Sequence, residues 1–281
     1  MSIDLLPQST WFVGCGNMAG AMVEGWRLGD VELSQAVAIR PSGQPVEGVR
    51  TVTSVGQAGR PPKLVILGFK PQLLDMVAPA LAPRLSAQTV VISILAGVEI
   101  ASLRARFPGV AAIVRAMPNL PVAVRRGVVG LTSADADDAL QQQLKQLFSV
   151  LGFVAWTASE AELAAIGSVA GAGPAYVARF IAALAKAGVE RGLNSDIAAT
   201  VALETVLGTG WLAAATGEGM AAIARRVASP NGTTEAGLAV LDHDEVLDAL
   251  ISVAIEAAAQ RGTELANEAR VDALAAAAPL A

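Results

Sequence analysis

The chain has 281 residues, of which 53% are hydrophobic and only 4% aromatic, and its net charge is −5. This length suffices for two ordinary domains, and the alanine-rich apolar fraction favours closely packed helices over a β-sandwich. Lysines and arginines are scattered, with adjacent pairs only at Arg125-Arg126 and Arg225-Arg226, so the basic stripe that nucleic acid requires is absent. One cysteine and one histidine exclude an internal disulfide and a Cys/His metal cage, and no metal site is expected.

The first half of the chain alternates short apolar runs with stretches of helical pattern. The runs are apolar nearly throughout, which is typical of parallel strands covered by helices on both faces. Strands are predicted at residues 10–14, 37–40, 64–67, 89–94, 111–115, 128–132 and 153–156, with helices at 17–28, 72–81 and 100–107.

Beyond about Thr157 the pattern becomes helical and rich in alanine. Turn-forming residues interrupt it at 171–174, 192–194 and 229–232, and Ser195 and Asp196 are suited to begin a helix. Strand–helix alternation followed by helices alone predicts an α/β chain. We expect an N-terminal Rossmann-like doubly wound domain over residues 1–157 and an all-helical domain over residues 158–281.

The N-terminal segment is unlike a targeting signal. Residues 1–7 contain Asp4 and lack the cationic start of a signal peptide. The longest apolar runs end well short of the roughly 20 residues that a membrane-spanning helix needs. We therefore expect a cytoplasmic protein that does not contact a membrane.

A glycine-rich turn lies between the first predicted strand and the first predicted helix. Residues 14–19 read Gly-Cys-Gly-Asn-Met-Ala, which is close to the spacing of a dinucleotide-binding turn. The first glycine permits the turn, the second lets the backbone approach a pyrophosphate, and the helix start supplies amide donors. Its position between strand and helix favours nucleotide binding over a purely structural turn. The predicted contacts are Gly14, Cys15, Gly16, Asn17 and Met18.

The end of the second predicted strand bears on the choice of cofactor. NAD enzymes usually carry an acidic residue there for the ribose 2′-hydroxyl, whereas this chain has Arg40-Pro41-Ser42. A guanidinium beside a hydroxyl suits a 2′-phosphate, which predicts NADPH as the cofactor, with NADH used less well. A solvated Arg40 is the alternative. Cys15 is interpreted as a small residue that fills the turn rather than as a reactive thiol.

A second candidate anion site lies at residues 229–234, which read Ser-Pro-Asn-Gly-Thr-Thr. Three hydroxyls and a flexible turn precede a helical pattern, so free amides and the positive end of a helix dipole are available to an anion. The alternative is an ordinary helix start capped by Thr233 or Thr234. A nucleotide-binding half in the same chain favours the anion site.

The motifs together resemble the pyrroline-5-carboxylate reductase family. No single segment is decisive, whereas their order and spacing over nearly the whole chain are specific. Besides residues 14–19 and 229–234, the matching segments are Phe69-Lys70-Pro71-Gln72, Ile92-Ser93 with Ala96-Gly97, Val-Arg-Ala-Met-Pro-Asn at 114–119, and Gly-Ala-Gly-Pro-Ala-Tyr at 171–176.

The resemblance implies roles for individual residues and for assembly. The Rossmann domain would bind NADPH, and the helical domain would bind a cyclic imino acid and form a homodimer, which can assemble further into a ring of dimers. Thr234 would be the catalytic residue, hydrogen-bonded to the ring nitrogen. The other implied contacts are Lys70, Pro71, Ala96, Gly97 and Asn119 for the cofactor, and Ser229, Gly232, Thr233, Glu160 and Arg226 for the substrate.

The implied reaction is the reduction of 1-pyrroline-5-carboxylate to L-proline, the last step of proline biosynthesis, by an oxidoreductase that acts on a C–N bond. Hydride passes from the nicotinamide to the carbon of the C=N bond. A protonated imine is already electrophilic, so alignment supplies most of the acceleration and no strong general acid is required. His243 lies in a polar stretch and is interpreted as solvated or capping.

Several departures from the family pattern leave the substrate open. Leu120 and Gly167 stand where the family usually has threonine, Ala172 replaces serine, Asn231 replaces glycine, and Arg226 stands where asparagine is expected. Lost hydroxyls favour an altered affinity or a related cyclic imino acid.

Two further alternatives remain at the level of the sequence. The first is a β-hydroxyacid-dehydrogenase-like enzyme with Lys186 as its acid/base, although Lys186 lacks the asparagine partners expected after it. The second is a non-catalytic NADP-binding protein, against which the hydroxyls of Ser229, Thr233 and Thr234 argue.

Overall fold

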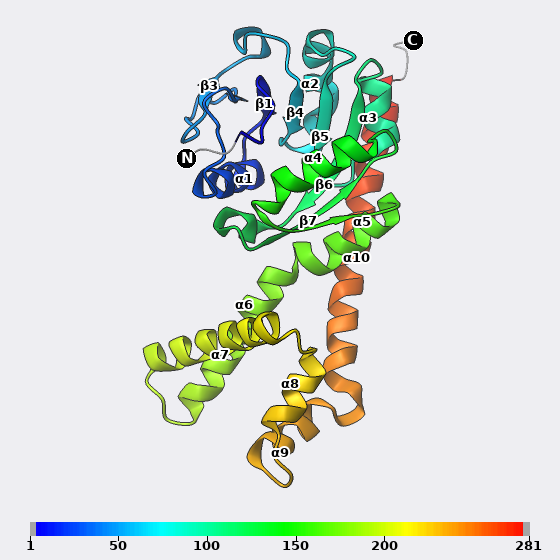
Figure 1. The fold of residues 1–281 in the computed structure, drawn as a ribbon. Helices are drawn as coiled ribbons and strands as arrows, with labels where there is room; N and C mark the ends of the chain where they lie inside the picture. Colours follow the sequence, from blue (N-terminus) through cyan, green and yellow to red (C-terminus); the bar gives the residue numbers. More distant parts are fainter. Residues whose placement is uncertain (1–3, 278–281) are drawn as a thin grey trace. The chain divides into compact units, whose positions relative to one another are not determined.

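The computed structural model describes residues 4–277. The side chains of residues 265–266 and 268–277 lie outside that description, as do residues 1–3 of the N-terminal segment and residues 278–281. Packing divides the described chain into two compact units (Figure 1). One contains the residues up to Ala172 together with those from Ala258 onward, and the other is Gly173–Ala257.

The first unit is built on an eight-stranded sheet in the order β3-β2-β1-β4-β5-β6-β7-β8. Neighbouring strands are parallel except β6 and β7, which pair antiparallel. The strand order runs outward from β1 in both directions, which confirms the predicted doubly wound fold. The strands are β1 (Thr10–Val13), β2 (Val37–Ile39), β3 (Arg50–Val52), β4 (Leu64–Leu67), β5 (Val90–Ser93), β6 (Ala112–Pro118), β7 (Gly127–Thr132) and β8 (Gly152–Trp156).

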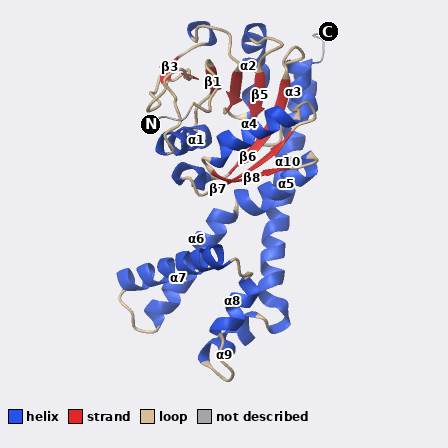
Figure 2. Ribbon diagram, viewed as in Figure 1, coloured by secondary structure: helices blue, strands red, loops and turns tan. Residues whose placement is uncertain are grey.

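Helices cover both faces of this sheet (Figure 2). Successive side chains of β1 point to opposite faces, so Phe12 and Trp11 enter different cores. Phe12 packs on Trp26, whose ring centroid lies 6.0 Å away, and Trp26 meets Phe148 at 5.6 Å. Trp11 lies in the core that includes Leu103. The helices are α1 (Asn17–Leu28), α2 (Leu74–Leu81), α3 (Ile100–Arg106), α4 (Asp138–Ser149) and α5 (Glu160–Ile166).

The chain changes from strand to helix after Trp156, but the first unit extends beyond that point. Helix α5 packs on β7, where a Cβ at Gly130 would lie 2.7 Å from Leu163 Cδ1. This packing explains why the first unit continues to Ala172. The domain boundary at residues 157/158 stays a prediction.

The second unit consists of helices joined by short loops, with no strand among its described residues. Asn194 Oδ1 accepts a hydrogen bond of 2.9 Å from Asp196 N and thereby caps the helix that begins at Ser195. The preceding helix packs closely against it, because a Cβ at Gly188 would lie 3.3 Å from Ala198 Cβ. The helices are α6 (Gly173–Glu190), α7 (Ser195–Thr216), α8 (Met220–Val227), α9 (Thr233–Leu241) and α10 (Val246–Ala277), the last of which continues into the first unit.

The predicted interruption at residues 171–174 takes an unexpected form. Instead of a loop, a π-helical turn at Gly167–Gly171 follows α5 directly, and α6 begins at Gly173. The side chain of Asn119 donates to the carbonyl of Ala170 in this turn at 3.0 Å. A π-turn shifts the hydrogen-bond register of a helix, and the side-chain amide of Asn119 donates to one of the carbonyls in this turn.

Short apolar runs do not exclude a membrane-spanning helix by length and composition, because that test uses the mean hydropathy of a long helical stretch. Two helical stretches, Glu160–Glu190 and Ser195–Thr216, meet that test. Each stretch contains few charged residues. Its mean hydropathy therefore stays high although polar residues interrupt its apolar runs. Such evidence is weak, because apolar helices that pack against other protein pass the same test.

Candidate functional site

The glycine turn joins β1 to α1 in a conformation that requires Gly14. The φ of Gly14 is +73°, and a Cβ there would lie 2.6 Å from Phe69 Cβ, so glycine is favoured on both counts. The amide of Gly14 donates to the Ile39 carbonyl at 2.9 Å, and Gly68 N donates to Val13 O at 2.9 Å. The turn is thereby fixed between the ends of β2 and β4.

Helix α1 begins directly after this turn with its amides unoccupied by side chains. Its N-cap is Gly16 in an extended conformation, no side chain caps it, and its first turn contains no acidic residue. Gly16 and Asn17 are exposed, and Met18 is half-buried. The positive end of the helix dipole is therefore open to an anion, as the predicted pyrophosphate contact requires.

Cys15 is a filler of the turn and not a nucleophile. Its side chain is buried, and this burial raises the pKa of the thiol to about 11, although the Arg40 charge works in the opposite direction. The thiol is thus protonated at neutral pH, where only a thiolate would be reactive. The position agrees with the structural interpretation of Cys15.

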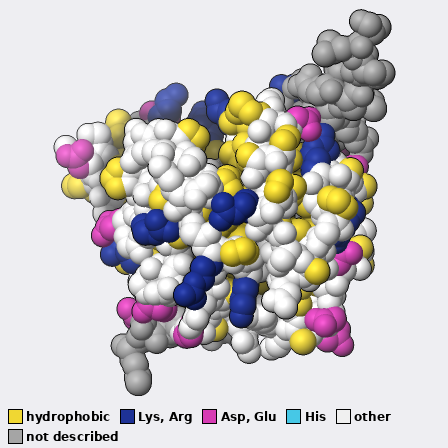
Figure 3. All heavy atoms as spheres, turned by 90° about the horizontal axis from the view of Figure 1, so that it is seen from above, with side chains coloured by type: hydrophobic (Ala, Val, Ile, Leu, Met, Phe, Trp, Pro, Cys, Tyr) yellow, Lys and Arg dark blue, Asp and Glu magenta, His cyan; other side chains and the backbone are white. Residues whose placement is uncertain are grey.

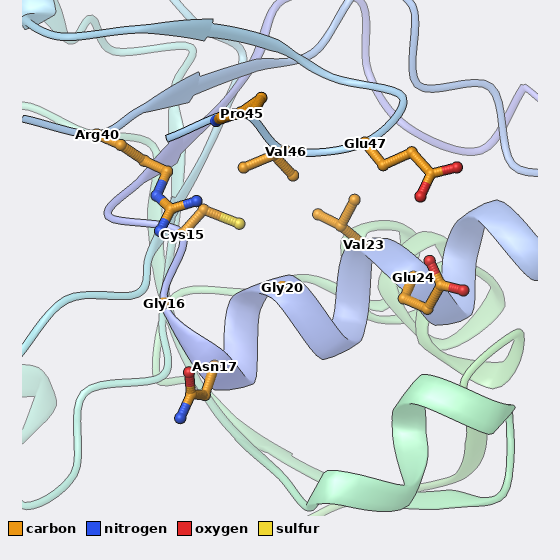
Figure 4. A pocket seen from close by; sticks show the side chains of 10 residues that line it. All are labelled: Cys15, Gly16, Asn17, Gly20, Val23, Glu24, Arg40, Pro45, Val46 and Glu47. Carbon is orange, nitrogen blue, oxygen red and sulfur yellow. The ribbon is translucent and has the colours of Figure 1, made fainter. Parts of the chain in front are cut away.

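A pocket of about 360 Å³ opens beside the turn and holds Arg40 (Figure 4). Arg40 follows β2 immediately, and in Figure 4 its guanidinium lies beside Cys15. Ser42, the other predicted 2′-phosphate ligand, does not line the pocket; its Oγ accepts from Gln44 N at 3.4 Å. The lining residues are Cys15, Gly16, Asn17, Gly20, Val23, Glu24, Arg40, Pro45, Val46 and Glu47.

The remaining predicted cofactor residues follow neighbouring strands at the same edge of the sheet. Lys70 and Pro71 follow β4, and Ala96 and Gly97 follow β5. Because β1, β4 and β5 are parallel, their carboxyl ends share the edge at which the glycine turn lies. Lys70 and Ala96 are exposed, and Gly97 has a φ of +73°. Ligands of open α/β sheets bind at this edge.

Asn119 lies after β6, but its side-chain amide is committed to the protein itself. The side chain is buried, with Oδ1 accepting from Val128 N at 2.8 Å and Nδ2 donating to Ala170 O at 3.0 Å. These bonds tie β7 and the π-turn to the end of β6. Asn119 therefore has a structural role in addition to its predicted contact with the cofactor.

Glu160 is likewise engaged within the first unit. Its Oε1 accepts from Arg115 Nη1 at 2.8 Å and from Ile100 N at 3.0 Å. Arg115 is a buried residue of β6, and Ile100 is the first residue of α3. Glu160 thus joins three elements, a role that the sequence pattern did not indicate.

The predicted anion loop at residues 229–234 lies in the second unit. Gly232 N donates to Ser229 O at 2.9 Å, and a Cβ at Gly232 would collide with Ser229 Oγ. Asn231 has a φ of +57°, a conformation that asparagine tolerates better than most residues. The departure from glycine at Asn231 therefore preserves the shape of the loop.

Helix α9 begins at Thr233, and its N-cap is Gly232 without any side-chain cap. The alternative in which Thr233 or Thr234 is the N-cap is therefore wrong. Thr234 is half-buried and Thr233 exposed. Arg226, also in this unit, is paired with Glu218 at 2.6 Å between Nη1 and Oε1.

The departure at Gly167 has a steric counterpart. A Cβ at this position in the π-turn would lie 3.2 Å from Met117 Cε. A threonine here would require Met117 to move. Leu120, the other lost threonine, is exposed.

A residue that the sequence interpretation missed is Gln44. It accepts two hydrogen bonds from Arg40, through its backbone carbonyl and its side-chain oxygen. Nothing in the stretch Ser-Gly-Gln-Pro distinguishes such a contact from a solvated loop, so only the tertiary structure reveals it.

Comparisons with known proteins agree with this arrangement. A family model described as pyrroline-5-carboxylate reductase dimerisation matches residues 160–265. The chain is 36% identical over 264 residues to the pyrroline-5-carboxylate reductase of Pseudomonas aeruginosa, covering 92% of this chain and 96% of that protein.

Solved structures extend the likeness to three dimensions. A pyrroline-5-carboxylate reductase from Coxiella burnetii is 30% identical, with a TM-score of 0.84 over 92% of this chain and 98% of that one. The Plasmodium falciparum enzyme, solved with NADP bound, shares the fold at 23% identity and a TM-score of 0.81, with coverages of 92% and 98%. The chain belongs to the pyrroline-5-carboxylate reductase family.

Proposed function

We propose that the protein is an NADPH-dependent reductase that converts 1-pyrroline-5-carboxylate to L-proline. The observation that carries the proposal is the 36% identity to a pyrroline-5-carboxylate reductase over 92% of the chain. The glycine turn with the Arg40 pocket and the loop at 229–234 supply two anion sites. The reaction needs two, one for the cofactor and one for the carboxylate of the imino acid.

The residues around the glycine turn fit NADPH. The uncapped start of α1 offers the amides of Asn17 and Met18 to the pyrophosphate. Arg40 would hold the 2′-phosphate, and Lys70, Ala96 and Gly97, which follow β4 and β5, would contact the rest of the cofactor. When bound, the nicotinamide supplies the hydride.

The loop at 229–234 holds the substrate. Amides at the start of α9 and the Ser229 hydroxyl bind the carboxylate, and the Thr234 hydroxyl orients the ring nitrogen. The hydride adds to the carbon of the protonated C=N bond, whose electron pair moves to nitrogen and gives the neutral secondary amine. The protein's task is therefore to position two reactants, which is where most of the acceleration arises.

Support for a homodimer comes from the matched dimerisation region and from exposed apolar side chains within it. These include Val177, Phe180 and Leu184 on α6 and Ile197, Val201 and Trp211 on α7. Apolar surfaces of this extent mark interfaces. A second copy of the chain covers these side chains in a soluble cytoplasmic dimer, and such dimers assemble further into a ring. Neither lipid nor nucleic acid is a partner in this proposal. On the face in Figure 3, Lys and Arg side chains stand in separate groups.

The alternative acid/base has little support. Lys186 is 80% exposed and lies 3.9 Å from Glu190 Oε1, one helical turn away. A lysine this exposed to solvent suits a surface ion pair better than proton transfer to a bound substrate.

The test is NADPH oxidation by the purified protein with a panel of substrates. The panel contains five- and six-membered cyclic imino acids, 2-keto acids and, in the reverse direction, 3-hydroxy acids. Turnover of the five-membered imino acid with release of L-proline supports the proposal. Preference for the six-membered ring would identify a related imino-acid reductase, and turnover of a 3-hydroxy acid would place the activity with the β-hydroxyacid dehydrogenases. Nucleotide binding without any turnover would refute the assignment as an enzyme.

A further inference from the structure

The loop after β2 turns back on itself and brings Gln44 against Arg40. Gly43 N donates to Arg40 O at 2.9 Å and closes a four-residue turn. Pro41 occupies the second position of this turn and Gly43, with a φ of +67°, the fourth, which are favoured positions for these residues. Gln44, the next residue, therefore returns to the strand end from which the Arg40 side chain projects.

Gln44 holds the guanidinium at two points. Arg40 Nη1 donates to the Gln44 carbonyl at 3.1 Å, and Nη2 donates to Gln44 Oε1 at 3.1 Å. The same residue also reaches the second predicted phosphate ligand, since Gln44 N donates to Ser42 Oγ at 3.4 Å. One glutamine thus contacts both side chains that the sequence assigns to the 2′-phosphate.

The tether leaves the guanidinium able to bind a phosphate. A guanidinium has five N–H donors, and the two bonds to Gln44 use two of them. Both acceptors on Gln44 are neutral oxygens. The carboxylates at the far end of the pocket, Glu24 and Glu47, are both paired with Arg27, and no ion pair joins Arg40 to a carboxylate among the described residues. The full positive charge of Arg40 therefore remains available inside the pocket.

We propose that Gln44 is a positioning residue that fixes Arg40 for the 2′-phosphate and so determines the preference for NADPH over NADH. A neutral acceptor suits this task, because a glutamate would orient the guanidinium equally well but neutralise it. A free arginine would have to lose its side-chain mobility on each binding event, whereas a tethered one has already lost it. This inference rests on the proposed use of NADPH through Arg40.

The experiment measures the dissociation constants of NADPH and NADH separately, by calorimetric titration of the full-length protein. Gln44→Ala removes the side-chain acceptor, and about a two- to tenfold weaker binding of NADPH is expected. Gln44→Glu keeps the acceptor and adds a charge, so a loss larger than that of Gln44→Ala is expected. NADH binding should change by less than about twofold in both variants, because NADH lacks the phosphate.

Two further variants make the result decisive. Gln57→Ala is the matched control: Gln57 Oε1 fixes a nearby loop through Thr53 N and Oγ1, at 3.0 and 2.9 Å, without touching Arg40. Its NADPH affinity should match that of the wild type. Arg40→Ala tests the proposed function itself.

If Arg40→Ala weakens NADPH selectively but Gln44→Ala does not, the tether is irrelevant and the inference is wrong. If Gln44→Ala tightens NADPH binding, Gln44 competes with the phosphate and the inference is again wrong. If Arg40→Ala affects both cofactors equally, the assignment of Arg40 to the 2′-phosphate fails instead.

Discussion

The engagement of Glu160 yields a prediction that separates a structural role from a role at the substrate. Glu160→Ala removes both hydrogen bonds of Oε1, those from Arg115 Nη1 and Ile100 N. The side chain of Arg115 then has no other hydrogen bond or ion pair among the described residues, and the first amide of α3 loses its acceptor. We expect the variant to fold but to be less stable.

The magnitude follows from how far the pair is shielded from water. Breaking a buried ion pair by removing one partner costs about 3–5 kcal/mol, since the other charge stays buried. Here the Arg115 side chain is 9% exposed, but that of Glu160 is 33% exposed, so water can partly replace the carboxylate. We therefore expect a loss of about 2–3 kcal/mol in the free energy of unfolding. For a protein of this size that corresponds to a Tm lower by about 4–12 °C.

Differential scanning calorimetry at pH 7 measures the change, and Glu162→Ala is the matched control. Glu162 lies on the same helix turn, and its Oε2 accepts an exposed hydrogen bond from Ala158 N at 2.9 Å. Its loss should cost less than about 1 kcal/mol. The double variant Glu160→Ala with Arg115→Met should recover part of the stability, because no unpaired charge is then buried.

The kinetic readout decides between the two roles of Glu160. If the carboxylate only joins β6, α3 and α5, Glu160→Ala assayed well below its Tm should keep kcat/KM for the imino acid within about threefold. A variant that melts like the wild type but loses tenfold or more in kcat/KM would refute the structural assignment and place Glu160 at the substrate.

Four further predictions follow from the loop at 229–234, the buried thiol and the apolar helices. Thr234→Val should lower kcat/KM for the imino acid by an amount equivalent to about 1.5–3 kcal/mol of transition-state stabilisation, with little change in NADPH affinity. Thr233→Val should lower kcat/KM less. Wild-type activity of Thr234→Val on every substrate would show that Thr234 has only a structural role. Cys15, with its pKa of about 11, should have about one thiolate per thousand at pH 8 and react slowly with iodoacetamide; fast labelling at pH 8 would contradict this. Because that pKa is raised above the 9.0 of a free thiol, its contribution to stability is full below pH 9 and is lost as the pH rises through 11. Sedimentation should detect a dimer or larger assembly at assay concentration. An active monomer would refute the proposal that a second copy of the chain covers the apolar side chains of α6 and α7.

The sequence predicted several elements of the nucleotide-binding half with their residue boundaries, and it missed β3 and α4. Helix α1 spans the predicted residues 17–28, and β4 spans 64–67, because uniform apolar runs and a glycine turn are local signals. The strand β3 (Arg50–Val52) was missed, since its three residues lie at the edge of the sheet, pair only with β2 and form no apolar run. Strand β6 is longer than predicted, because Arg115 suggested its end and is in fact buried against Glu160.

The candidate residues at 14–18, 40–42 and 229–234 were predicted from short motifs whose chemistry depends on residue type and spacing, whereas Glu160 and Arg226 were implied by the family resemblance alone. What only the tertiary structure decided is which partners those residues find. Gln44 holds Arg40, Asn119 joins β7 to the π-turn, and Glu160 pairs with an arginine 45 positions earlier. The contacts of Asn119 and Glu160 depend on distances between side chains of separate elements, and the contact of Gln44 depends on the path of one turn; the order of residues along the chain encodes neither locally.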